Sequence, residues 1–93
     1  MGYYFQNTDE QSKQTVWTKG QVIAGYDSRI WRKDMCGKIM CYSDHGKTTQ
    51  YGWEIDHILP VAKGGSNYVS NLQPLHWSNN RTKSDKYPWY CEL

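Results

Sequence analysis

The chain has 93 residues and a formal net charge of +2, so we expect one domain, and its charge alone does not identify a nucleic-acid-binding protein. No apolar run approaches the roughly 20 residues of a membrane-spanning helix, which excludes a membrane protein of that kind. Residues 1–13 contain neither the basic region nor the apolar core of a signal peptide. These features favour a cytoplasmic protein, or one exported by a route that needs no signal peptide.

The N-terminal third has the weakest local pattern. Residues 1–15 are polar after an aromatic start and show no helical or strand period, so we expect a flexible arm, with a short edge strand as the alternative. Residues 16–26 mix β-branched and aromatic side chains with Gly20 and Gly25, which favours a loop or short strand over a helix. We assign residues 16–93 to a single domain, whose core draws on five Trp and eight Tyr.

A β-hairpin is predicted over residues 31–42, with its tight connection at residues 35–38. Basic side chains lie in and beside this segment, so one side of the hairpin is expected to be basic. Such a side is either a solvated face or a surface that contacts phosphate groups. The residues concerned are Arg29, Arg32, Lys33 and Lys38.

The segment from Trp53 to His57 alternates between apolar and polar residues, which predicts a half-buried strand. Alternation places Glu54 and Asp56 on one face and His57 on the other. Asp56 and His57 can serve one site only if the strand ends there and the backbone bends. Pro60 supports such an ending.

Residues 58–70 are predicted to form a long loop, in which Gly64 and Gly65 permit positive φ. A second strand over residues 71–75 would pair antiparallel with the first. Ser78 is the expected N-cap of a helix that runs to about Lys86, before Pro88.

The order Asp56-His57, Asn71-Leu72 and Asn80 resembles the HNH endonuclease family of ββα-metal nucleases, in a variant whose last anchor is Asn rather than His. The part before the motif is similar to what precedes it in small bacterial members. The resemblance implies an α+β fold with a ββα-metal unit at about residues 53–86, preceded by a β-hairpin and an aromatic-rich N-terminal region. It also implies that Asn71 braces the loop instead of binding metal.

The residue types suit phosphodiester hydrolysis with one metal ion. Asp56 and Asn80 offer the oxygen ligands that Mg²⁺ or Mn²⁺ prefers, and Glu54 is a further candidate ligand on the Asp56 face of the strand. An imidazole can accept a proton near neutral pH, so His57 is the candidate general base. We assign catalytic roles to His57, Asn71 and Lys83. Basic side chains are assigned to nucleic-acid contact: Arg29, Arg32, Lys33, Lys38, Arg81 and Lys83.

The cysteines give little sign of a bracing site. Cys36, Cys41 and Cys91 are an odd number, so a complete disulfide framework is not expected and a reducing compartment is favoured. A structural zinc site is not expected either, because these cysteines and His76 lack the spacing of zinc ligands.

The sequence therefore predicts a metal-dependent endonuclease that nicks or cuts DNA with weak sequence preference. The alternative is a non-catalytic ββα module that binds nucleic acid or a protein. The cofactor would be one Mg²⁺ or Mn²⁺ ion and the partner double-stranded DNA, with an immunity protein or a phage or secretion machinery as further partners. Restriction, phage packaging, a mobile element and an exported interbacterial toxin remain alternatives for the biological role.

Overall fold

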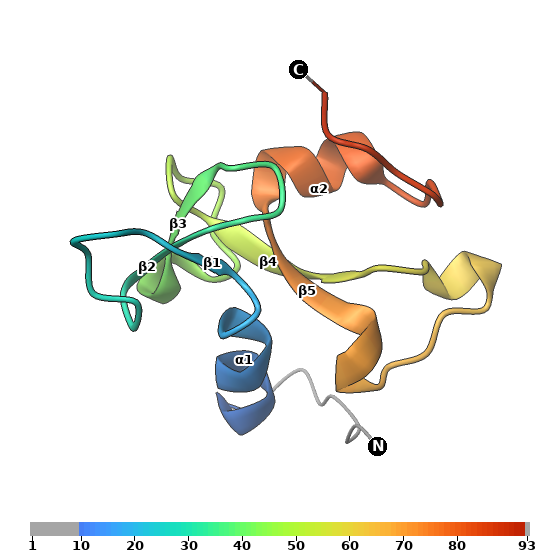
Figure 1. The fold of residues 1–93 in the computed structure, drawn as a ribbon. Helices are drawn as coiled ribbons and strands as arrows, with labels where there is room; N and C mark the ends of the chain where they lie inside the picture. Colours follow the sequence, from blue (N-terminus) through green and yellow to red (C-terminus); the bar gives the residue numbers. More distant parts are fainter. Residues whose placement is uncertain (1–9, 93) are drawn as a thin grey trace.

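Two helices and two antiparallel sheets form the α+β fold of residues 10–92, the part of the chain that the computed structural model describes (Figure 1). Three 3₁₀ helices lie in the segments that connect the strands. Neither α-helix in these residues has the length and apolar character that crossing a membrane requires. The elements in chain order are α1 (Glu10–Trp17), β1 (Gln21–Val22), β2 (Trp31–Lys33), β3 (Ile39–Cys41), η1 (Tyr42–Asp44), β4 (Trp53–His57), η2 (Val61–Lys63), η3 (Val69–Asn71), β5 (Leu72–His76) and α2 (Trp77–Lys83).

The first sheet has the strand order β1-β2-β3 and contains the predicted hairpin. Strands β2 and β3 pair antiparallel with Trp31 opposite Cys41, which confirms the hairpin. Gly37 has φ of 86° in the turn, a conformation that glycine adopts without steric cost. The sequence did not reveal that β1 adds a third strand, in which Gln21 pairs with Lys33.

Helix α1 corrects the interpretation of the N-terminal segment. The expectation of an arm without helical structure is wrong for residues 10–15, and residues 1–9 lie outside the described residues. The local pattern is weak because the large apolar side chains, Val16 and Trp17, stand only at the end of the helix. Both are buried against the rest of the protein, so tertiary packing stabilises a helix that its own sequence barely favours. The division into arm and domain remains a prediction.

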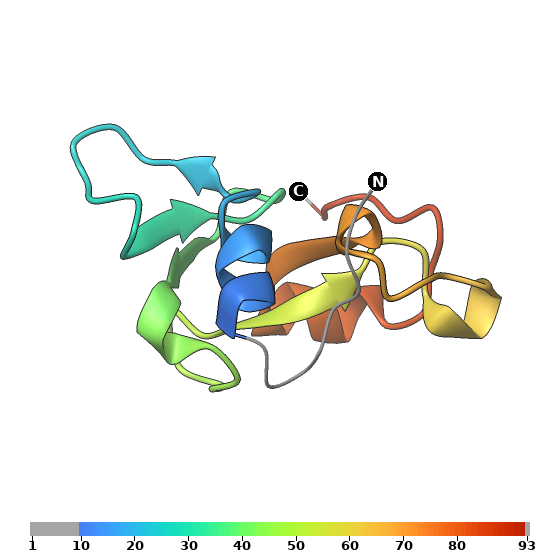
Figure 2. The ribbon, with the colours of Figure 1, turned by 90° about the horizontal axis from the view of Figure 1, so that it is seen from below.

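The second sheet is the β4–β5 hairpin, which lies between the two helices (Figure 2). Its antiparallel register pairs Trp53 with His76 and Asp56 with Gln73. The second strand begins at Leu72, one residue later than predicted, and ends at His76. Two apolar clusters cover the α1 side of this hairpin: Val16, Val69 and Leu72, and Trp17, Met40 and Trp53.

Helix α2 starts and ends differently from the prediction. Its N-cap is His76, whose ring accepts a hydrogen bond from the Ser78 N–H, so the assignment of Ser78 as N-cap is wrong. The helix ends at Lys83 rather than near Lys86, because Ser84 has a positive φ of 52°, which a helix cannot contain.

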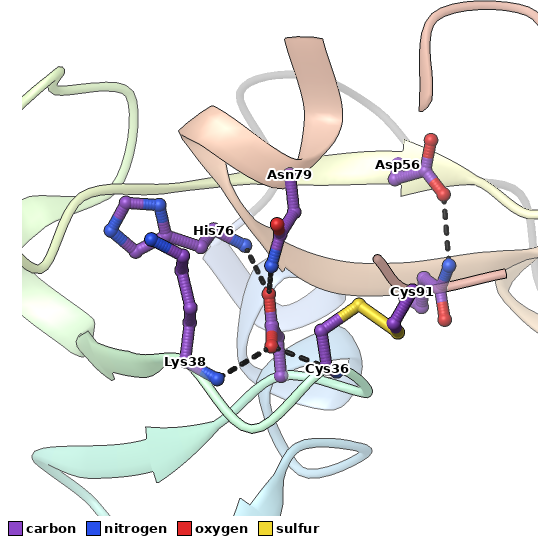
Figure 3. Close-up of a disulfide and its surroundings, with 8 residues drawn as sticks. Cys36, Lys38, Asp56, His76, Asn79 and Cys91 are labelled. Carbon is purple, nitrogen blue, oxygen red and sulfur yellow. Dashed lines mark hydrogen bonds between the residues drawn. A yellow bond between two sulfur atoms is a disulfide. The ribbon is translucent and has the colours of Figure 1, made fainter. Parts of the chain in front are cut away.

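A disulfide joins Cys36 to Cys91 and ties the segment after α2 to the β2–β3 turn (Figure 3). The two Cα atoms are 5.5 Å apart, although 55 positions separate the residues in sequence. Cys41 is the free thiol among the described residues. The odd number of cysteines therefore did not indicate reduced cysteines, because pairing depends on distance in the fold. The bonded sulfurs are no longer free to ligate zinc.

Candidate active site

Strand β4 presents its two carboxylates toward α2, as its alternation predicts. Lys83 Nζ donates to Asp56 Oδ1 at 3.1 Å, and Asn80 Nδ2 donates to Glu54 Oε1 at 2.8 Å. Trp53, on the opposite face of the strand, is completely buried in an apolar cluster. One strand therefore has an apolar face that supports the fold and a polar face that meets a helix.

A cleft of about 290 Å³ lies where β4 ends. Asp56 and His57 at the end of β4 and Asn80 on α2 all line this cleft. The remaining walls come from the residues after the strand and after α2. They are Ile55, Pro60, Val61, Ala62, Ser84 and Asp85. The bend expected after His57 thus brings together a carboxylate, an imidazole and a carboxamide.

Asp56 is 5% exposed and has partners on both carboxylate oxygens. Lys83 contacts Oδ1, and Gln73 Nε2 donates to Oδ2 at 2.9 Å (Figure 3). Lys83 is itself only 2% exposed, and its ammonium also donates to the His57 main-chain oxygen at 2.9 Å. A buried ion pair of this kind needs such additional hydrogen bonds to offset the loss of hydration. The enclosed ammonium fixes Asp56 and the end of β4, a position that does not suit the predicted direct contact with DNA phosphate.

The His57 ring is oriented by Asn67, a loop residue that the sequence did not single out. His57 Nε2 lies 2.7 Å from Asn67 Oδ1. A carboxamide oxygen can only accept, so the imidazole carries its proton on Nε2 in this arrangement. The neutral ring then has Nδ1 as its basic nitrogen.

Asn71 fastens the loop that follows His57. Its Oδ1 accepts from Leu59 N at 2.9 Å, and its Nδ2 donates to Leu59 O and to Ser66 O. Gly65 allows the same two parts of the loop to approach, since a Cβ at this position would lie 1.7 Å from Leu59 O. The predicted positive φ is found at Gly64, where φ is 92°. Gly65 is needed instead for the close approach to Leu59. Asn71 does not line the cleft, and its contacts hold two parts of the loop, at Leu59 and Ser66, together.

A comparison with known families matches residues 36–86 to the HNH endonucleases, which is more than half of the chain. The chain belongs to the HNH endonuclease family. Membership implies a function of the nuclease type, a nucleic-acid substrate and, typically, a divalent metal. No curated protein and no solved structure matches the chain.

The basic residues of this HNH domain are not gathered around the cleft. Arg29 forms two side-chain hydrogen bonds to Asp27, and Arg32 donates to three main-chain oxygens. Lys33 ends β2 and Lys38 lies in the turn that follows it, and neither residue lines the cleft. Arg81, whose side chain is 57% exposed, lies beside the cleft but contacts Glu54. The predicted basic residues therefore do not form one surface around the cleft, and Arg29, Arg32 and Arg81 contact other groups of the protein.

Asp34 is a structural residue that sequence analysis missed. Its carboxylate is fully buried and accepts from Cys36 N, Lys38 N, His76 N and Asn79 Nδ2. These bonds connect the β2–β3 turn to the junction of β5 and α2, where Figure 3 places His76 and Asn79. Asp at the first and Gly at the fourth position of residues 34–37 is a signal for a turn, and Asp in a turn commonly accepts from the main-chain N–H two residues on, as it does here from Cys36. The two distant bonds have no local signal.

The donor set in the cleft suits the divalent metal that HNH nucleases typically use. Within residues 10–92 no group of three or more His, Cys, Asp or Glu is placed to hold a metal ion. Mg²⁺ nevertheless needs few protein ligands, because it retains several of its waters. The Asp56 carboxylate and the Asn80 carboxamide oxygen are hard donors that line one cleft, so they fit such an ion. Glu54 does not line the cleft, and its Oε1 accepts from both Asn80 and Arg81.

Proposed function

We propose that this HNH domain is a metal-dependent endonuclease that hydrolyses phosphodiester bonds in double-stranded DNA, by nicking or by cutting both strands, with weak sequence preference. The observation that carries the proposal is the meeting of Asp56, His57 and Asn80 in one cleft. Weak sequence preference follows from the small size of the domain, which leaves little surface for contacts with base edges.

His57 acts as the general base in this proposal. Asn67 holds the proton on Nε2, so Nδ1 is the nitrogen that accepts a proton from the attacking water. Asn71 acts from outside the cleft, because it fixes the loop that carries Asn67 and so limits displacement of the imidazole. Small displacements of a catalytic group are costly to rate.

Asp56 and Asn80 would hold one Mg²⁺ or Mn²⁺ ion. When bound, such an ion polarises the scissile phosphate and stabilises the leaving oxygen. Lys83 keeps the Asp56 carboxylate in place and contributes to catalysis through that residue. Arg81, at the exposed side of α2, is the basic residue best placed to meet DNA phosphate. Lys33 and Lys38 do not line the cleft and would add to affinity only where a bound duplex reaches them.

The proposal is tested by incubating supercoiled plasmid with the purified protein in Mg²⁺ or Mn²⁺, with and without excess EDTA. We expect nicked or linear product with metal and none with EDTA, and restored cleavage when metal is added back in excess. Undiminished cleavage in EDTA would refute the metal requirement. Duplex binding in a gel-shift assay without cleavage in any metal would favour the alternative of a non-catalytic ββα module. A matched RNA substrate cut in place of DNA would contradict the assignment of DNA.

The Cys36–Cys91 disulfide bears on the compartment in which the protein acts. Disulfides persist mainly in oxidising compartments, so the Cys36–Cys91 bond favours export over a cytoplasmic location. An exported nuclease suits the toxin role, with an immunity protein as a partner, better than it suits restriction. Alkylation of free thiols in protein purified without reductant tests this preference, since one modified cysteine is expected and three would oppose it.

A further inference from the structure

Glu54 lies two residues before Asp56 on the same face of β4, yet it does not line the cleft. Its carboxylate is directed to α2, where Oε1 accepts from Asn80 Nδ2 at 2.8 Å and from the Arg81 guanidinium at 2.7 Å. The side chain is 24% exposed, so the contact with Asn80 is partly shielded from water. Glu54 thus touches one residue of the cleft without belonging to it.

This contact decides which end of the Asn80 amide faces the cleft. The two ends of a carboxamide have nearly the same shape, but the oxygen accepts hydrogen bonds and the nitrogen donates them. A carboxylate accepts only, so Glu54 attracts the nitrogen and would repel the oxygen. With Nδ2 held by Glu54, Oδ1 is the end of the amide that remains for the cleft.

We propose that Glu54 is a positioning residue, which sets the Asn80 carboxamide so that its oxygen, and not its nitrogen, serves a divalent cation. Arg81 assists by holding the same carboxylate oxygen from the outer side of α2. The proposal rests on the nuclease function proposed above, and it assigns Glu54 a role different from that of a metal ligand. Partners that orient metal ligands typically change metal affinity by about 10- to 100-fold when they are removed.

Two variants of Glu54 separate the roles. Glu54→Ala removes the acceptor, whereas Glu54→Gln keeps a carbonyl oxygen for Asn80 Nδ2 but removes the negative charge. We expect Mn²⁺ affinity, measured by calorimetry or electron paramagnetic resonance, to fall about 10-fold or more in Glu54→Ala. In Glu54→Gln it should remain within about threefold of the wild-type affinity, because a carbonyl oxygen still holds Asn80 Nδ2 and keeps the amide oriented. Equal losses in both variants would identify the charge or direct ligation as the important property and would overturn the proposal.

A second measurement reads the contact without metal. In metal-free protein, the side-chain amide resonances of Asn80 should shift in Glu54→Ala and stay near their wild-type positions in Glu54→Gln. The matched control is Glu10→Ala, which removes a carboxylate that also pairs with a cation and accepts a hydrogen bond, from Lys13 and Tyr42 respectively. Glu10 does not line the cleft, and its removal should change neither the Asn80 signals nor Mn²⁺ affinity.

The outcomes distinguish this proposal from the proposed function. Unchanged Mn²⁺ affinity in Glu54→Ala, with metal-dependent plasmid cleavage intact, would overturn the positioning role and leave the nuclease proposal standing. Absence of both Mn²⁺ binding and cleavage in the wild-type protein would overturn the nuclease proposal, and the positioning role with it.

Discussion

The two faces of the β4–β5 hairpin are stabilised in different ways. On the α1 side of the hairpin, apolar and aromatic side chains pack together. Among them are Trp17 of α1 and Trp53 of β4, whose ring centroids are 5.0 Å apart. Toward α2 it places Asp56 against the buried ammonium of Lys83, and Glu54 against Asn80. Neither apolar cluster contains a residue of α2.

This difference separates stability from chemistry within one small sheet. Apolar burial on the α1 face is non-directional and contributes free energy in proportion to area. The α2 face gains little net stability from its charges, but its hydrogen bonds fix the directions of the side chains at the cleft. We infer that substitutions in the α1 core and in the cleft at the end of β4 will have opposite signatures, a loss of folding for the core and a loss of rate for the cleft.

The largest expected effect is on rate and comes from His57→Ala. If His57 is the general base, kcat should fall by about 10²- to 10⁴-fold. The free energy of unfolding should change by less than about 1 kcal/mol, because the ring lines a cleft and is not packed in a core. Plasmid nicking under single-turnover conditions and urea unfolding measure the two quantities. Cleavage at the wild-type rate would remove His57 from the mechanism.

Trp53→Ala should give the opposite signature. Loss of this fully buried ring should lower the free energy of unfolding by about 3–5 kcal/mol, the usual cost of deleting a large aromatic side chain from a core. If the variant does not fold, Trp53→Phe preserves most of the ring and should retain folding at reduced stability. Urea denaturation measures the loss. A change below about 1 kcal/mol in Trp53→Ala would contradict the role given to the α1 face.

Reduction of the Cys36–Cys91 disulfide should have an intermediate effect on stability. The bond closes a long loop, and its loss is expected to lower the free energy of unfolding by about 2–4 kcal/mol. Thermal unfolding with and without reductant measures this effect. Cys41→Ser is the control, because it leaves the disulfide intact and should not abolish the response to reductant. A wild-type protein indifferent to reductant would show that the α2 side does not depend on the bond.

The smallest effect concerns pH and His45, which packs on Trp53 with ring centroids 4.7 Å apart. Burial lowers the His45 pKa and nearby Lys13 lowers it further, while Glu10 and Glu54 oppose the shift. A lowered pKa in the folded protein means that the unfolded chain binds the proton more tightly. Stability linked to His45 is therefore fully present above a pH of about 6.5 and declines below it.

His45→Phe retains a ring on Trp53 and removes the titration. The melting temperature of the wild-type protein should fall more between pH 8 and pH 5 than that of the variant. Parallel pH profiles would exclude a contribution of His45 to the pH dependence of the core.

The sequence predicted the β4, β5 and α2 part of this HNH domain better than the rest, because the patterns that define these elements are local in the sequence. Alternation from Trp53 to His57 is a local property, and it correctly separated the two faces of β4. Helix α1 was missed because its stability comes from Val16 and Trp17 meeting residues far along the chain.

Long-range polar contacts were also beyond sequence reasoning. Asp34 accepts hydrogen bonds from residues 42 and 45 positions away, and Glu54 meets Asn80 at a separation of 26. Lys83 was correctly placed on α2, but its burial depends on the end of β4 and on the segment after the helix. Residue type and spacing indicate what a side chain can do, whereas its surroundings in the fold determine what it contacts.

The boundaries of the family match differ from those of the folded unit. Lys19 follows α1 and extends its ammonium to the main-chain oxygens of Val69 and Leu72, where η3 leads into β5. A fragment cut at residues 36–86 would keep Asp56, His57 and Asn80 but would lack Trp17, Lys19 and Cys91. Trp53 would lose a packing partner, and two carbonyl groups would lose their cation. Such a minimal nuclease module would hold every residue assigned to the chemistry and still lack the scaffold that keeps them in place.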